Sequence, residues 1–196
     1  MDRTKERTGI VISGLPASGK STLANMLSKE YGKQVYSIGR IWRERWAELY
    51  PDGEVSFEQF WRGTSAADNL QVNLDARLLF ESGSVIGDSR YAPFADNKKC
   101  LLVFLTADIE VRVERVSVRD DYRGKTHDEI RRILREREED EAKTGHELFK
   151  FDYRDPTLYH AVINSGLLTP AQEFEAVKAL LNMKRSESSP VSVAVS

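Results

Sequence analysis

Apolar residues in this chain recur in short runs that alternate with longer segments of mixed polarity. The short runs have strand length, and the most apolar of them, 100–105, is typical of a central strand buried on both faces. The longer segments carry apolar residues at spacings of three and four, which indicates helices. The pattern predicts five strands, at 8–13, 35–38, 84–88, 100–105 and 161–164. It predicts helices at 19–31, 40–50, 56–62, 65–81, 109–119, 127–144 and 170–183.

Local signals set the ends of several predicted helices. Thr126 and Glu129 have the spacing of a capping box, so the long charged helix should begin at residue 127. Gly145 should end the same helix, because glycine readily adopts the left-handed conformation that follows a helix. In the helix predicted at 65–81, three leucines share one face: Leu70, Leu74 and Leu78.

The regular alternation of strands and helices predicts the fold class. It favours an α/β protein with a five-stranded parallel sheet and helices on both faces. Ligands of such folds collect at the carboxyl ends of the strands. That edge should carry four segments, at 14–21, 39–40, 88–90 and 164–166.

One of these segments is a phosphate-binding motif. Residues 14–21 read G-L-P-A-S-G-K-S and match the P-loop pattern, between a predicted strand and a predicted helix. Backbone N–H groups of such a loop converge on phosphate oxygens, and the helix adds its positive end. Lys20 should reach the outer phosphates of ATP, and the Ser21 hydroxyl should ligate Mg²⁺. The expected nucleotide-binding residues are Gly14, Leu15, Pro16, Ala17, Ser18, Gly19, Lys20, Ser21 and Thr22.

Composition narrows the class of protein. The chain has 196 residues, 40% of them hydrophobic, which predicts one domain with a substantial core. With a net charge of −2, the chain has no overall positive field that would attract nucleic acid. The single cysteine leaves no internal disulfide, and no apolar run has membrane-spanning length. We therefore expect a cytoplasmic protein without a membrane or nucleic-acid partner. Residues 184–196 are rich in serine and lack periodicity, which predicts a disordered tail.

Further residues indicate which phosphate chemistry the motif serves. Asp88 ends an apolar strand, as the Mg²⁺-linked acid of P-loop proteins does, although a strand-end turn residue is the alternative. The guanine-reading pattern N-K-x-D is absent, because Asn97-Lys98-Lys99 is followed by Cys100. Many arginines lie at 112–137, where helix, polar loop and helix suit a lid over transferring phosphates. Ion pairs on a solvated helix are the alternative for each arginine.

The order of these motifs resembles that of the nucleoside monophosphate kinases, in particular the short archaeal-type cytidylate kinases. The resemblance covers about residues 8–182. Several segments carry it, in the order and at the spacing of the family. They are residues 12–14 directly before the P-loop, residues 36–39 with Arg43 after them, the segments 85–90, 111–115 and 137–141, the pair Asp155 and Tyr159, and the segment 162–164.

The resemblance implies transfer of the γ-phosphoryl group of ATP, with Mg²⁺, to a nucleoside monophosphate, CMP or dCMP. It assigns Arg43 and Arg90 to the acceptor phosphate, and Arg119 and Arg137 to the lid. Arg40, at the edge that carries the acceptor region, is a further candidate for substrate binding. Lys20 and Asp88 complete the catalytic set, with Ser21 and Asp88 as metal ligands. Residues 1–183 would form the kinase domain, with an acceptor-binding helical region at 39–82 and a lid at 119–137. The partners would be small-molecule nucleotides, and the protein a monomer or homodimer.

The chain departs from the family pattern beside the acceptor. Arg40 follows Gly39 where the family has an aspartate, Ser89 replaces a glycine, and residues 63–80 align loosely. Trp42 and Trp46 are core residues at helical spacing or, alternatively, stack on a base. Two other functions stay open: a P-loop kinase for another small metabolite, and an ATP-binding regulatory protein without catalysis.

Overall fold

The fold is a five-stranded parallel sheet in the order β2-β3-β1-β4-β5. A computed structural model describes residues 8–182, apart from the side chain of Glu58. The predicted tail at 184–196 lies outside the described residues. The strands are β1 (Gly9–Gly14), β2 (Gln34–Ser37), β3 (Val85–Asp88), β4 (Cys100–Thr106) and β5 (Ala161–Asn164). All five strands were predicted to within two residues at either end, and the parallel pairing confirms the predicted sheet.

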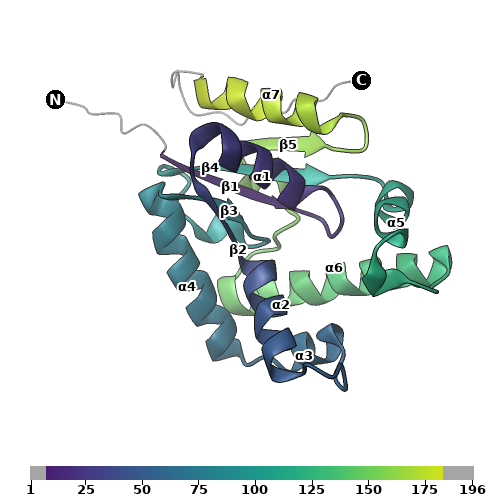
Figure 1. Ribbon diagram of the computed structural model, residues 1–196. Helices are drawn as coiled ribbons and strands as arrows, with labels where there is room; N and C mark the ends of the chain where they lie inside the picture. The colour runs from purple at the N-terminus through teal and green to yellow at the C-terminus, as the bar shows by residue number, and fades with distance from the viewer. Residues whose placement is uncertain (1–7, 183–196) are drawn as a thin grey trace.

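Helices cover both faces of this sheet (Figure 1). The strands alternate their side chains between two buried clusters, as a sheet covered on both sides requires. Ile10 and Ile12 of β1 pack with α1 (Lys20–Tyr31) and α7 (Pro170–Asn182). Val11 packs on the opposite face, with α2 (Ile38–Leu49) and α4 (Ala66–Ser82). The remaining helices are α3 (Phe57–Gly63), α5 (Ile109–Ser117) and α6 (His127–Phe149).

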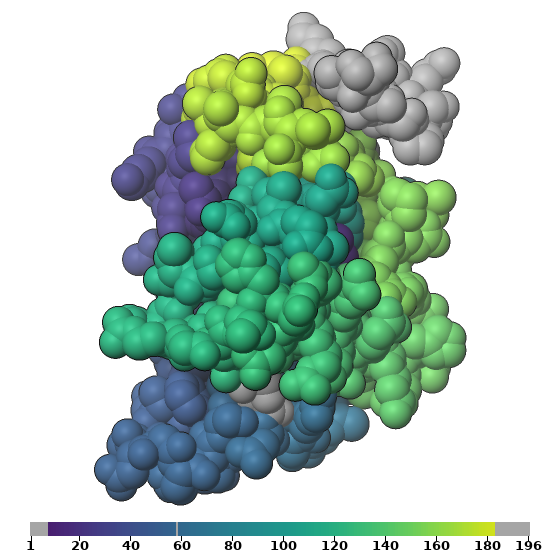
Figure 2. Space-filling model, turned by 90° about the vertical axis from the view of Figure 1, so that its right-hand side faces the viewer, coloured from purple at the N-terminus to yellow at the C-terminus, as the bar shows by residue number. Residues whose placement is uncertain are grey.

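The edge at the carboxyl ends of the strands faces α2, α3, α5 and α6. In Figure 2 the region of α2 and α3, in blue, lies directly against α6, in green, along one side of the molecule. An ion pair at 3.0 Å between Arg62 of α3 and Asp140 of α6 joins them. The segment 39–82 therefore contacts α6, the helix that begins within the predicted lid at 119–137.

The prediction that Gly145 ends the long helix is wrong. α6 continues to Phe149 and ends at Lys150, which adopts the left-handed conformation with φ of 64°. Gly145 is buried inside the helix, and a Cβ there would lie 3.1 Å from the Tyr91 ring. The glycine therefore serves close packing rather than helix termination.

The leucine face of α4 points to solvent. Leu70, Leu74 and Leu78 are all exposed, Leu78 by 70%. The buried side of α4 instead carries two asparagines with Ala76 and Phe80. The Asn73 side chain donates to the backbone carbonyl of Asn69 at 2.8 Å, which satisfies its amide without a partner on another helix.

Within residues 8–182, no helix combines the length and the apolar character that crossing a membrane requires.

Candidate active site

The P-loop leads from β1 into α1 and lines a cavity at the carboxyl edge of the sheet. Gly14 and Gly19 have φ values of 145° and 98°, which L-residues with a side chain rarely adopt. A Cβ on Gly14 would also lie 2.2 Å from the carbonyl oxygen of Leu105, so β4 leaves no room for one. These two glycines allow the loop to curl, and the N-terminal end of α1, with Lys20 and Ser21, then lies at the site.

Lys20 folds back over this loop. Its Nζ donates to the carbonyl oxygens of Gly14 and Leu15, both at 2.8 Å. Burial of the ammonium group and the nearby charge of Arg90 lower the pKa of Lys20 to about 7, although Asp88 and Glu141 act in the opposite direction. This lysine is therefore held by two backbone carbonyls and is only partly charged at neutral pH.

Asp88 connects the P-loop with the start of α2. Its Oδ2 accepts from the Ser21 hydroxyl at 2.9 Å and from the Ser37 hydroxyl at 3.0 Å. Ser37 ends β2 and also caps α2, because its Oγ accepts from the backbone N–H of Arg40. A carboxylate and a hydroxyl in contact at a P-loop are oxygen ligands that suit Mg²⁺. Ser21 and Asp88 thus have the chemistry and the proximity of the predicted metal ligands.

Three of the predicted arginines converge beside the P-loop. Arg90 follows β3, and its backbone carbonyl accepts from the Ser13 hydroxyl at 2.7 Å. Arg43 lies on α2, 4.8 Å from the centre of the Phe57 ring, and burial together with Arg137 and Arg90 lowers its pKa to about 10. Arg137 comes from α6. Such a cluster of guanidinium groups attracts phosphate groups.

The carboxylate of Glu141 lies between two of these arginines. It forms an ion pair with Arg90 and accepts from Arg137 Nε at 2.7 Å. Its side chain is only 1% exposed. Sequence reasoning missed Glu141 as a functional residue, because a glutamate four positions after an arginine is also the usual pattern of a solvated helix.

Two adjoining cavities make up the site. One has a volume of about 220 Å³ and is lined by P-loop residues including Lys20 and Ser21, and by Asp88, Arg40, Arg43 and Arg119. The other has a volume of about 140 Å³ and is lined largely by α2, α3 and α6. Gly39, Trp61, Arg90 and Arg137 belong to both linings. The arginine cluster therefore stands at the junction of a phosphate-binding cavity and a second chamber.

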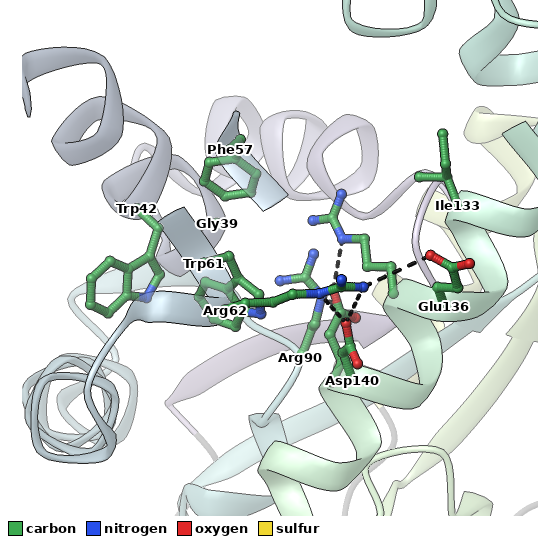
Figure 3. A pocket seen from close by; sticks show the side chains of 11 residues that line it. Gly39, Trp42, Phe57, Trp61, Arg62, Arg90, Ile133, Glu136 and Asp140 are labelled. Atoms are coloured by element: carbon green, nitrogen blue, oxygen red, sulfur yellow. Dashed lines mark hydrogen bonds and ion pairs between the residues drawn. The ribbon is translucent and has the colours of Figure 1, made fainter. Parts of the chain in front are cut away.

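The second chamber is aromatic on one side and charged at its rim (Figure 3). Trp42, Phe57 and Trp61 form the aromatic side, and Ile133 comes from α6. Arg62 extends from α3 toward α6, where it pairs with Asp140 at 3.0 Å and Glu136 at 3.8 Å. Trp42 is buried in the core as well as lining the chamber. Trp46 does not line the chamber: it donates to the Val55 carbonyl at 2.8 Å and packs edge-on against the Phe57 ring.

The remaining predicted arginines differ in their placement. Arg119 is exposed at the rim of the first cavity. Arg40 also lines this cavity, but its guanidinium bonds the Val35 carbonyl at 3.1 Å and lies 3.5 Å from Glu44. Arg112 is buried and donates to the Ala107 and Pro16 carbonyls, so it braces the P-loop from outside.

Comparisons with known proteins agree with this geometry. Residues 9–167 match the model of the cytidylate kinase-like family. The chain is 32% identical over 186 residues to a cytidylate kinase from Methanopyrus kandleri, covering 88% of this chain and 92% of that protein. It is 29% identical over 181 residues to a cytidylate kinase from Pyrococcus horikoshii, with 91% and 90% covered.

Solved structures share the fold at lower identity. An uncharacterized protein from Eubacterium ventriosum matches with a TM-score of 0.64 and 16% identity, covering 89% of this chain and 98% of that one. A shikimate kinase from Bacteroides thetaiotaomicron matches with a TM-score of 0.55 and 18% identity, with the same coverage. These likenesses confirm the predicted P-loop kinase fold and carry no argument about the acceptor.

Proposed function

The chain belongs to the cytidylate kinase-like family, and from this membership we propose that it transfers the γ-phosphoryl group of ATP to CMP or dCMP. It is an enzyme of the nucleoside monophosphate kinase class. The products of the proposed reaction are the nucleoside diphosphate and ADP. The observation that carries the proposal is the junction of the two cavities at Arg90 and Arg137. A phosphate on each side of that junction would bring donor and acceptor together.

The P-loop side fits the donor. The N–H groups of the loop and of the first turn of α1 suit the phosphates of ATP, and Lys20 would leave its two carbonyl partners to reach them. Ser21 and Asp88 would hold Mg²⁺, which when bound neutralises charge on the transferring phosphoryl group. Asp88 would also keep the start of α2 in place through Ser37.

The arginines fit the two ends of the transferred group. We assign the acceptor phosphate to Arg43 and Arg90, because both line the cavity on the side of α2. Arg40 would contribute charge at the rim. Arg137, and Arg119 from the lid segment 119–137, would stabilise the charge of the transferring phosphoryl group. The N-terminus of α2 lies at the same place and adds a favourable field for an anion.

The aromatic chamber fits a nucleobase joined to that acceptor phosphate. Phe57 and Trp61 offer ring faces for stacking, with Ile133 on the α6 side. Carboxylates are the acceptors that suit the exocyclic amino group of cytosine, and Glu136 and Asp140 stand at the rim. Uracil has a carbonyl oxygen at that position, which a carboxylate repels. The segment 39–82 would thus select the acceptor together with α6.

A panel of acceptors tests the proposal. ADP release would be followed in a coupled assay with CMP, dCMP, UMP, AMP, GMP, shikimate and gluconate as separate acceptors. We expect turnover with the cytidine nucleotides well above the rate of ATP hydrolysis without an acceptor. Turnover with a sugar or shikimate alone would support a metabolite kinase instead, and ATP binding without any transfer would support a regulatory protein.

The variant Asp140→Asn provides a matched test of base recognition. It keeps the size of the side chain but turns one acceptor atom into a donor, so we expect the preference for CMP over UMP to fall about tenfold or more. An unchanged preference would contradict the assignment of the cytosine amino group to this rim.

A further inference from the structure

Glu141 is the carboxylate most deeply enclosed by the site, and its contacts reach both sides of the cavity junction. One oxygen accepts from Arg137 Nε on its own helix at 2.7 Å. The other pairs with Arg90, which follows β3, and lies 3.4 Å from the hydroxyl of buried Tyr153. The backbone carbonyl of Glu141 accepts from the Tyr91 hydroxyl at 2.9 Å, which ties this turn of α6 to the segment after β3.

The two arginines keep this buried carboxylate ionised. Burial alone would raise the pKa of Glu141, but the charges of Arg90 and Arg137 lower it below its ordinary value. A buried ion pair gains little net stability, because desolvation of the charges offsets most of their attraction. The arrangement therefore calls for a reason other than stability, and its place at the cavity junction suggests one.

We propose that Glu141 is a positioning residue that holds the guanidinium groups of Arg90 and Arg137 at a fixed separation, so that acceptor and transferring phosphates bind in line. This role depends on the proposed function, because Arg90 is taken to bind the acceptor phosphate. Glu141 lines the second chamber, but the proposed role rests on its contacts with the two arginines and not on contact with a phosphate. Its two oxygens bridge Arg90, which follows β3, and Arg137 of α6, which is the last residue of the lid segment 119–137.

A purely electrostatic role makes the opposite prediction for substrate binding. If Glu141 only balanced charge, its removal would make the cavity more positive, and phosphate groups would bind more tightly. If Glu141 positions the two arginines, its removal leaves them repelling each other, and the acceptor phosphate loses its aligned partners. The Michaelis constant for the acceptor therefore separates the two roles.

The variants Glu141→Gln and Glu141→Asp test the proposal. Glutamine keeps the shape but directs an N–H donor at one guanidinium group, and aspartate keeps the charge but is one methylene shorter. We expect both to raise the KM for CMP and to lower kcat/KM for CMP by about 100-fold, the scale of a small misplacement of reacting groups. The KM for ATP should stay level or fall in Glu141→Gln, because an anion near Lys20 is removed, and it should stay level in Glu141→Asp, which keeps the charge.

Glu139→Gln is the matched control. Glu139 lies on the same helix and pairs with Arg154 at 2.5 Å, but its side chain is exposed and does not line either cavity. It should show wild-type constants for both substrates. A general loss of folded structure would instead change both KM values or the amount of active enzyme, which thermal melting by tryptophan fluorescence would reveal.

A double-variant cycle identifies the residue through which Glu141 acts. In an Arg90→Lys background, Glu141→Gln should cost little further acceptor affinity, since the aligned guanidinium group is already gone. Fully additive losses would overturn the proposal, as would wild-type acceptor constants in folded Glu141→Gln and Glu141→Asp proteins. A lower acceptor KM in Glu141→Gln would replace positioning with charge balance.

Two further outcomes keep the test decisive. If neither Glu141 variant folds, Tyr153→Phe removes the hydroxyl beside the carboxylate while its ring still fills the core. That variant should raise the KM for CMP several-fold and leave the KM for ATP unchanged, and unchanged values for both would overturn the proposal.

If the wild-type protein phosphorylates no monophosphate, the proposed function fails and this role fails with it. If the wild-type protein phosphorylates a monophosphate and the variants have the same kinetic constants, only the role of Glu141 fails.

Discussion

ATP binding to this protein should take up a proton, and Lys20 should be the group that accepts it. The Lys20 ammonium group is buried against two carbonyls beside Arg90, and its pKa is about 7. When the phosphates of ATP reach Lys20, their negative charge favours its charged form, so the pKa should return toward the ordinary value of a lysine, about 10.4. Binding then requires protonation of the fraction of Lys20 that is neutral.

The size of the effect follows from the shifted pKa. With a pKa of about 7, Lys20 is about half charged at pH 7 and about one-tenth charged at pH 8. ATP should therefore take up about 0.5 proton at pH 7 and about 0.9 proton at pH 8. Its affinity should fall about fivefold between these pH values and about tenfold for each further unit until the pKa of the bound lysine is reached.

Isothermal titration calorimetry measures this uptake directly. Binding of a non-hydrolysable ATP analogue is recorded at pH 8 in two buffers that differ in ionisation enthalpy, and the difference in heat gives the number of protons. At this pH the phosphates are already ionised, so they contribute little. Lys20→Arg is the matched control, because a guanidinium group remains charged throughout the range. No uptake by the wild-type protein, or equal uptake by Lys20→Arg, would refute the reasoning.

Two further predictions concern acidic side chains. Asp88→Asn should lower kcat about 100- to 1,000-fold and raise the Mg²⁺ concentration needed for half-maximal rate, because the remaining Ser21 hydroxyl is a weak ligand; a wild-type Mg²⁺ requirement would contradict the metal assignment. Glu173 on α7 is buried, which raises its pKa to about 7 despite nearby Arg115. The folded state therefore binds this proton more tightly than the unfolded chain, and stability is lost as pH rises from about 4.5 to about 7. Glu173→Gln should raise the free energy of unfolding by about 2 kcal/mol at pH 8 and little at pH 4.5, as measured by urea denaturation. An equal gain at both pH values would show that its charge is not the cause.

The elements of this fold were predictable because each depends on local pattern. The strand Cys100–Thr106 is apolar up to its last residue, and the P-loop motif specifies four positions within eight consecutive residues. The encounter of Ser21 with Asp88 was also within reach, since parallel strands bring their carboxyl ends to one edge. What the sequence lacks is the strand order, which places β3 beside β1 and thereby sets the distance between these residues.

The missed features depend on contacts between distant segments. Gly145 has the local signature of a helix end, but its role is set by Tyr91, more than fifty positions earlier. The leucines of α4 share one face, yet the buried side of this helix carries Asn69 and Asn73. Glu141 looks like any acid on a charged helix, and only the position of Arg90 makes it different. Local pattern cannot distinguish these cases, because it carries no information about the facing surface.

The direct passage of β2 into α2 has a consequence for how such an enzyme can change its substrate. Ser37 belongs to the strand, caps the helix and bonds Asp88, so the start of α2 is fixed to the sheet. The short helix α3 is bounded by the turns at 50–56 and 64–65. We therefore expect that exchanging residues 51–65 for those of a relative would change the acceptor preference while Ser37 and Asp88 stay in place.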